Sequence, residues 1–264
     1  MQLADEASVM IRHAFAARRH TLSEKSANDF ATDTDREVEA MMAARIAADF
    51  PGDVLLGEEG GERVLGDSLA NNVRWIIDPL DGTFNFVHGF PYIATSIAVE
   101  VDGAVQAGVI ANPVSSEVFS AGKGFGAWLH MPDQPPARLA VSLEHTLASG
   151  LIGSVLPSAA SKSFDRVLPA WLDVARCAGS IRRTGAAALD LAQVAAGRLD
   201  GFFVMSLSAW DAAAGALLVT EAGGRVCDFT GGDNYMNSNQ VIAGSSGVAA
   251  ELAAVLGQYA VSAG

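Results

Sequence analysis

The sequence predicts a mixed fold, with an α+β lobe over residues 1–142 followed by an α/β lobe over residues 143–264. Two helical patterns come first and are followed by strand patterns that short turns connect, whereas the second half alternates short strands with helices. The length of 264 residues suits one large domain or two closely joined lobes. We place the lobe boundary after the proline-rich segment 130–142.

The first half opens with two predicted helices, over residues 2–20 and 33–49. Apolar residues recur at helical spacing in both, and the second pattern stops before a Pro-Gly-Asp turn signal. The dipeptide Asp102-Gly103 favours a hairpin, because both central positions of such a turn need positive φ. Further strands of a predicted antiparallel meander lie at 73–78, 92–101, 104–114 and 117–124.

The second half changes rhythm, as expected for a sheet with helices packed on it. Short apolar runs alternate with helical patterns in the order typical of an α/β layer. The predicted strands are 150–156, 180–183, 200–205 and 225–229, and the predicted helices are 162–175, 186–197 and one that starts at 211.

Composition and charge exclude several classes of function. The chain has 17 basic and 30 acidic residues, a net charge of −13, which disfavours direct binding to nucleic acid or to an anionic membrane. Charged residues interrupt the N-terminal apolar pattern, whereas a signal peptide has an uninterrupted apolar core. No apolar run reaches the length of a membrane span. The two cysteines lack a CxxC spacing. We therefore expect a cytoplasmic protein with no membrane contact.

The stretch WIIDPLDGTFNFVHGFP, residues 75–91, holds two acids three positions apart after a strand-like run. Pro79 favours a turn and Gly82 lets the backbone approach a ligand, so Asp78 and Asp81 are expected in one loop mouth. With the carbonyl of Leu80 they offer the oxygen ligands that Mg²⁺ takes. An isolated Asp-x-x-Asp more often forms an Asx turn on a solvated loop, so this pair alone does not decide for a metal.

Two further acids favour the metal hypothesis. Glu58 follows an apolar run, and Asp211 stands at the start of a helix, although Glu58 alone fits a surface loop and Asp211 alone fits a helix N-cap. Four carboxylates in one cleft would raise one another's pKa unless cations neutralised them. Gly82 and Thr83 could supply backbone N–H groups to a phosphate, and an ST turn is the alternative for Thr83.

Three segments resemble the signature motifs of the inositol monophosphatase family of metal-dependent, lithium-sensitive phosphatases. They are GEE (57–59), WIIDPLDGTFNFVHGFP (75–91) and AWDAAAGALLVTEAGG (209–224), and NDFATDTDREVE and RRTGAAALDLAQVAAGRLDGFF are similar to further family segments in the same order. The resemblance implies the layered α-β-α-β-α sandwich of inositol monophosphatases and fructose-1,6-bisphosphatases. It also implies a homodimer that binds a small phosphorylated substrate.

The same resemblance implies two to three Mg²⁺ ions in each site. Glu58, Asp78 and the Leu80 carbonyl would hold one ion, while Asp78, Asp81 and Asp211 would hold a second. A third, weaker ion would share Glu58.

The resemblance also assigns catalytic roles. Glu58, Thr83 and Asp35 would be catalytic, with Thr83 and Asp35 positioning a water that attacks the phosphorus in line without a covalent phosphoenzyme. Without the family, Asp35 fits an exposed first-turn acid. Lys25 is similar to a basic residue of a mobile family loop, and a solvated lysine is the alternative.

Substrate selection is the least determined property. Asp81, Gly185, Ala186 and Ala187 resemble residues that border the sugar pocket, although the three small residues would equally serve close packing. Val204 replaces the acid that contacts inositol in selective members, which puts specificity for inositol in doubt.

The expected function is Mg²⁺-dependent hydrolysis of a phosphorylated polyol, with myo-inositol 1-phosphate as the default substrate. Fructose 1,6-bisphosphate, histidinol phosphate and phosphoadenosine phosphate remain alternatives within the same chemistry. A different class of function is a protein-binding regulator of transcription, because some bacterial relatives act on that machinery.

Overall fold

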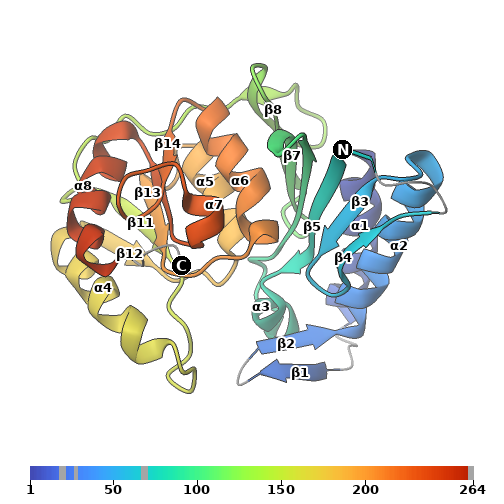
Figure 1. The fold of residues 1–264 in the computed structure, drawn as a ribbon, viewed down its shortest axis with the longest axis horizontal. Helices are drawn as coiled ribbons and strands as arrows, with labels where there is room; N and C mark the ends of the chain where they lie inside the picture. The colour runs from blue at the N-terminus through green and yellow to red at the C-terminus, as the bar shows by residue number, and fades with distance from the viewer. Residues whose placement is uncertain (18–21, 27–28, 67–70, 261–264) are drawn as a thin grey trace.

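A large and a small β-sheet, a two-stranded hairpin and eight α-helices make up the described chain in the computed structural model, which describes all residues except 18–21, 27–28, 67–70 and 261–264 (Figure 1). A separate hairpin pairs β1 (Leu22–Ser26) with β2 (Asp29–Thr32). The helices are α1 (Gln2–Ala17), α2 (Asp33–Asp49), α3 (Thr83–His88), α4 (Phe164–Cys177), α5 (Ala187–Ala195), α6 (Ala209–Glu221), α7 (Tyr235–Ser238) and α8 (Ser246–Leu256), with a 3-10 turn η1 (Gly257–Tyr259).

The large sheet has eight strands in the order β10-β9-β8-β7-β6-β5-β3-β4. Neighbouring strands are antiparallel except for β3 and β5, which run parallel. The strands are β3 (Val54–Gly57), β4 (Gly61–Val64), β5 (Val73–Asp81), β6 (Ala94–Val101), β7 (Ala104–Asn112), β8 (Glu117–Gly122), β9 (Gly126–His130) and β10 (Ala137–Arg138).

The small sheet has five strands in the order β12-β11-β13-β15-β14. Its β11 is parallel to both neighbours, whereas β15 is antiparallel to β13 and β14. The strands are β11 (Leu151–Ser154), β12 (Ser180–Arg182), β13 (Gly201–Val204), β14 (Arg225–Cys227) and β15 (Val241–Gly244).

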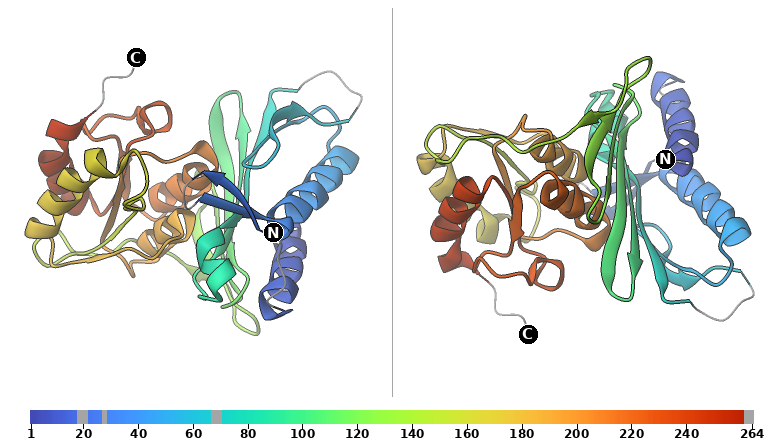
Figure 2. Two further views of the ribbon diagram at one scale, coloured as in Figure 1. Left: turned by 90° about the horizontal axis from the view of Figure 1, so that it is seen from below. Right: turned by 90° about the horizontal axis from the view of Figure 1, so that it is seen from above.

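The elements stack in five layers, as the two views in Figure 2 also show. Helices α1 and α2 pack on the outer face of the large sheet, α5 and α6 lie between the sheets, and α4 and α8 cover the far face of the small sheet. Three hydrophobic clusters fill the interfaces between layers, and the largest of them spans both faces of the middle helix layer. The predicted α-β-α-β-α sandwich is confirmed.

The middle layer is close-packed because its helices are built from small residues. Gly215 on α6 meets Leu191 on α5 so closely that an added Cβ would lie 2.5 Å from the leucine Cβ. Gly108 on β7 likewise leaves room for Ala214, whose Cα would lie 3.0 Å from an added Cβ. These contacts bring the first turn of α6 and the ends of the large-sheet strands into one region, where the candidate site lies.

Several local predictions are confirmed and others are incomplete. Helix α2 has the predicted bounds, and the β6–β7 turn places Asp102 at φ 50° and Gly103 at φ 76°. The N-terminal helix ends at Ala17, and residues 18–20 of that prediction lie outside the described chain. The patterns missed the hairpin of β1 and β2, the strands β4, β9, β10 and β15 and the helices α7 and α8. The strands and α7 are too short to show a period, and α8 is mostly apolar around its circumference.

The lobe boundary after residue 142 stays a prediction. The large sheet takes strands up to Arg138 and the small sheet takes strands from Leu151 onward, but α5 and α6 of the second half pack on both sheets. No α-helix within the described ranges has the length and apolar character needed to cross a bilayer.

The contact between α5 and α6 gives a testable stability prediction. Gly215→Ala should lower the free energy of unfolding by about 1–3 kcal/mol, because the added methyl group must displace Leu191 in a closed layer. Urea denaturation measures the effect. Gly122→Ala is the matched control, since its Cβ would lie an ordinary 3.5 Å from Phe125. Equal stability of Gly215→Ala and the unaltered protein would contradict the tight packing.

Candidate metal centre

An irregularity at the end of β5 brings Asp78 and Asp81 into the same region. Asp78 pairs with Ser96 and Asp81 with Ala94, so β5 has one residue more than β6 over this interval and the register shifts. The Pro79 carbonyl accepts a hydrogen bond from the Thr95 hydroxyl at 2.9 Å, and the Leu80 N–H donates to Asp78 Oδ1 at 2.9 Å. The bulge therefore aims two acids, three positions apart, at one point.

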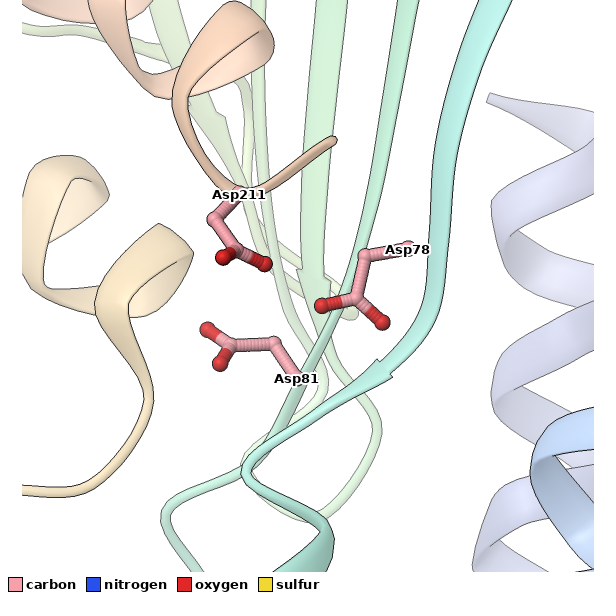
Figure 3. Close-up of side chains that lie close together, drawn as sticks. All are labelled: Asp78, Asp81 and Asp211. Carbon is pink, nitrogen blue, oxygen red and sulfur yellow. The ribbon is translucent and has the colours of Figure 1, made fainter. Parts of the chain in front are cut away.

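A third acid meets them there. Each of Asp78, Asp81 and Asp211 offers one carboxylate oxygen, and these three atoms all lie within 4.8 Å of one another (Figure 3). Asp78 is 2% exposed and Asp81 is 8% exposed. Burial first, and then the charges of Glu58, Asp211 and Asp81, raise the pKa of Asp78 well above its ordinary value. A bound cation would relieve this repulsion, and Mg²⁺ suits an all-oxygen donor set.

Asp211 comes from the first turn of α6. Ser208 occupies the N-cap position, so Asp211 is the third residue of the helix rather than its cap. The Ser96 hydroxyl of β6 donates to the carbonyl of Trp210 at 2.9 Å and fixes the start of α6 against the large sheet. The carboxylate is thereby held facing the bulge of β5.

Asp81 also caps the N-terminus of helix α5 in the middle layer. Its carboxylate accepts from the N–H groups of Ala187, Ala188 and Leu189, at 3.2, 2.8 and 3.4 Å, at the start of α5. A helix N-terminus stabilises a carboxylate through these donors and through the helix dipole. Burial and the charge of Asp211 still leave the pKa of Asp81 well above its ordinary value.

Glu58 approaches the cluster from the turn after β3. Its N–H donates to the Ile77 carbonyl at 3.3 Å, which ties the turn to β5 next to Asp78. Glu58 is outside the group whose oxygens lie within 4.8 Å, but its charge raises the pKa of both Asp78 and Asp35. The four predicted metal-binding acids therefore share one electrostatic environment.

Thr83 and Asp35 also meet at this site. The Thr83 hydroxyl lies 3.0 Å from Asp35 Oδ1 and 3.1 Å from the Leu80 carbonyl. Asp35 is 1% exposed and shares a capping box with Thr32, whose N–H donates to it at 2.8 Å. Burial raises the pKa of Asp35, while hydrogen bonds from Thr32 and Thr83 oppose the rise. The alternative that Asp35 is an exposed first-turn acid is wrong.

Gly82 allows α3 to begin against the second half of the chain. It has φ 87°, and a Cβ there would lie 3.1 Å from the Tyr92 carbonyl and 3.2 Å from Ala186 Cβ. A left-handed conformation and a close approach both require glycine at this position.

The predicted sugar-pocket residues differ in exposure. Gly185 is exposed, whereas Ala186 and Ala187 are 1% and 6% exposed and belong to the core between the sheets. Val204 is in the same core. Gly185 lies at the edge of a cavity of about 740 Å³ whose wall includes Phe84, Leu156, Phe164 and Arg183. Lys25 belongs to β1, and its side chain lies outside the described structure.

Two buried acids near the site were missed by sequence reasoning. Asp190 on α5 is fully buried and accepts from the hydroxyls of Tyr92 and Thr184 at 2.8 and 2.7 Å. Glu39 on α2 is 3% exposed and binds the turn that carries Glu58. The sequence offered one signal for both acids: each stands on the helix face that carries apolar residues, where a charge needs a partner.

Comparison with known proteins agrees with this architecture. Residues 1–260 match the model of the inositol monophosphatase family. The Pseudomonas aeruginosa protein named Nus factor SuhB is 41% identical over 228 residues, which are 86% of this chain and 82% of that protein. The layered α-β-α-β-α fold and the sequence match together place the chain in a class of phosphatase-like proteins. The chain belongs to the inositol monophosphatase family.

Solved structures extend the similarity to three dimensions. The extragenic suppressor protein suhB from Bartonella henselae superposes with a TM-score of 0.88 at 37% identity, covering 97% of this chain and 95% of that one. SaIMPase-II, described with inositol monophosphate bound, gives a TM-score of 0.77 at 25% identity over 98% of this chain and 92% of that one. A second SaIMPase-II structure is described with 2′AMP bound, with a TM-score of 0.78 at 25% identity, covering 98% and 93%.

Asp190 gives a prediction about pH. Burial raises its pKa to about 7, whereas an unfolded aspartate has a pKa of about 3.9. The stability that this group contributes is therefore fully present below about pH 4 and is lost as the pH rises toward 7. Asp190→Asn, which resembles the neutral acid, should raise the free energy of unfolding at pH 8 by roughly 1–4 kcal/mol and change it little at pH 4.

Denaturant unfolding at both pH values checks this prediction in metal-free protein. Asp133→Asn, on an exposed turn at φ 58°, removes the same charge and serves as the control. An equal effect of Asp190→Asn at pH 4 and pH 8 would contradict the assigned protonation.

Proposed function

We propose that this chain is a Mg²⁺-dependent phosphomonoesterase that hydrolyses a small phosphorylated polyol, with myo-inositol 1-phosphate as its first candidate substrate. The observation that carries the proposal is the cluster formed by the buried Asp78 and Asp81 with the partly buried Asp211, whose charges repel one another without a cation. Membership of the inositol monophosphatase family supports the same chemistry.

The residues at the site fit a magnesium centre. We assign Glu58, Asp78 and the Leu80 carbonyl to one ion and Asp78, Asp81 and Asp211 to a second, with Glu58 shared by a weaker third. Carboxylates and a carbonyl are the hard oxygen ligands that Mg²⁺ binds. When bound, Mg²⁺ would supply positive charge that stabilises the phosphate and the departing alkoxide and lowers the pKa of water.

Thr83 and Asp35 are assigned to the attacking water. When the Thr83 hydroxyl donates its proton to Asp35, at 3.0 Å, the lone pairs of the hydroxyl oxygen are free to accept a hydrogen bond from that water. The buried Asp35 carboxylate fixes the hydroxyl rotamer and increases the basicity of its oxygen. Backbone N–H groups of Gly82 and Thr83, at the start of α3, are assigned to the phosphate.

The leaving group is expected to lie toward Gly185, beside the cavity that Phe84 and Arg183 line. Val204 offers no hydrogen bond to a sugar hydroxyl, so selectivity for inositol is expected to be weak. The SaIMPase-II structures, with inositol monophosphate in one and 2′AMP in the other, favour a broad substrate panel. Fructose 1,6-bisphosphate, histidinol phosphate and phosphoadenosine phosphate therefore belong in the assay beside myo-inositol 1-phosphate.

Asp78→Asn tests the central assignment. It should lower Mg²⁺-dependent phosphate release at least about 1,000-fold on every substrate of the panel, because it removes the acid assigned to both ions. Phosphate release is measured with and without Mg²⁺, and Asp102→Asn, an exposed turn residue at φ 50°, is the control. Retained activity in Asp78→Asn would contradict the metal centre.

Thr83→Ala tests the assignment of the water-positioning hydroxyl. It should reduce kcat about 100-fold or more with little change in the affinity for Mg²⁺, whereas Thr83→Ser should keep most of the activity. Steady-state kinetics at saturating Mg²⁺ separate the two variants. A wild-type kcat in Thr83→Ala would remove Thr83 from the mechanism.

A second candidate function is a protein-binding role in transcription, with the chain acting as a homodimer. The relatives named Nus factor SuhB, 41% identical in Pseudomonas aeruginosa, favour it. Analytical ultracentrifugation of the purified chain, alone and with purified bacterial RNA polymerase, tests both parts. Co-sedimentation that Asp78→Asn does not weaken would establish a role independent of catalysis, and a monomer at all concentrations would exclude the homodimer.

A further inference from the structure

Glu39 lies beneath the turn that carries Glu58. It is on α2, 3% exposed, with its carboxylate directed at the backbone between β3 and β4. Oε2 accepts from the N–H of Glu59 at 2.8 Å, and Oε1 accepts from the N–H of Gly60 at 3.0 Å. Oε1 also forms an ion pair with Arg63 at 3.0 Å. Both carboxylate oxygens are therefore bonded to residues that directly follow Glu58.

The turn encloses this carboxylate tightly. A Cβ on Gly57 would lie 2.5 Å from Glu39 Oε2, and one on Gly60 would lie 2.7 Å from Oε1. Glu58 is thus flanked by two residues that contact Glu39: Gly57, which packs against its carboxylate, and Glu59, whose N–H donates to it. The path of the backbone through Glu58 is determined by a side chain from another element.

The same helix supports the opposite side of the site. Asp35 precedes Glu39 by one helical turn, so both acids lie on one face of α2. Asp35 contacts the Thr83 hydroxyl and Glu39 contacts the turn of Glu58. One rigid helix therefore sets the distance between the water-positioning hydroxyl and an assigned metal ligand.

We propose that Glu39 is a positioning residue that fixes the carboxylate of Glu58 toward Asp78 and thereby sets the affinity of the site for divalent metal. The inference rests on the proposed function, because it takes Glu58 as a metal ligand. Groups that orient metal ligands commonly change metal affinity by about 10-fold to 100-fold when they are altered. Glu39 acts through two backbone hydrogen bonds and touches neither the metal nor the substrate.

Glu39→Gln is the decisive variant. Glutamine preserves the shape but offers one acceptor oxygen, so its NH₂ group must face the N–H of Glu59 or of Gly60 and lose that hydrogen bond. The dissociation constant for Mn²⁺, titrated without substrate by electron paramagnetic resonance, should rise about 10-fold. The Mg²⁺ concentration for half-maximal phosphate release should rise in parallel, while KM at saturating Mg²⁺ stays unchanged.

Glu62→Gln is the matched control. Glu62 is on the neighbouring strand β4, 56% exposed, and pairs with Arg74 at the surface, so this variant removes the same charge without touching the turn. Its Mn²⁺ affinity should equal that of the unaltered protein. Circular dichroism at the titration temperature establishes that each variant is folded.

Gly57→Ala provides a second route to the same effect. Its methyl group must displace the Glu39 carboxylate while leaving every side chain at the site intact. It should also weaken Mn²⁺ binding about 10-fold. Unchanged Mn²⁺ affinity in folded Glu39→Gln would overturn the inference and leave the proposed function in place. Absence of Mn²⁺ binding in the unaltered protein would instead overturn the proposed function and the inference together.

Discussion

Three aspartates around one point, two of them buried, are unfavourable in themselves, and much of the surrounding structure holds them in place. Burial and mutual repulsion raise the pKa of Asp78 and Asp81, so the metal-free arrangement costs folding free energy. The fold accepts this cost because each acid is fixed by backbone elsewhere. Asp81 binds the start of α5, Asp78 binds the Leu80 N–H within the bulge, and Asp211 follows a helix start tied to β6.

The layered architecture explains how these constraints reach one place. The middle helices contact both sheets, and their small residues let α5 and α6 approach closely. On the other face of the large sheet, α2 supports the site through two acids on one of its sides. The site is therefore held from the helix layers on both faces of a single sheet, which limits the movement of its side chains before any ligand binds.

Family membership and the proposed activity have different support. The match over residues 1–260 and the superposition on suhB from Bartonella henselae establish the family and its fold. A shared fold is compatible with several substrates and with a regulatory role, because function depends on the site. The similar proteins include one named Nus factor SuhB and a SaIMPase-II structure described with inositol monophosphate bound. The fold alone therefore does not distinguish between these functions for this chain.

The sequence by itself determined the local features whose signals lie within a few residues. The bounds of α2, the Asp102-Gly103 turn and the position of two acids after a strand follow from spacing and turn chemistry. The motifs also identified the acids that the structure brings together, including Asp211, which is remote in sequence. Their roles as ligands remain predictions.

Tertiary structure alone decided which side chains are buried and what they contact. Asp35 is enclosed rather than exposed, Ala186 and Ala187 face the core, and Glu39 and Asp190 serve contacts that no local pattern marks. Each of these outcomes depends on residues far away in the chain, as when Asp81 caps a helix that begins 106 positions later. Burial is a property of packed layers, so a sequence period can indicate which face turns inward but not which partner it meets there.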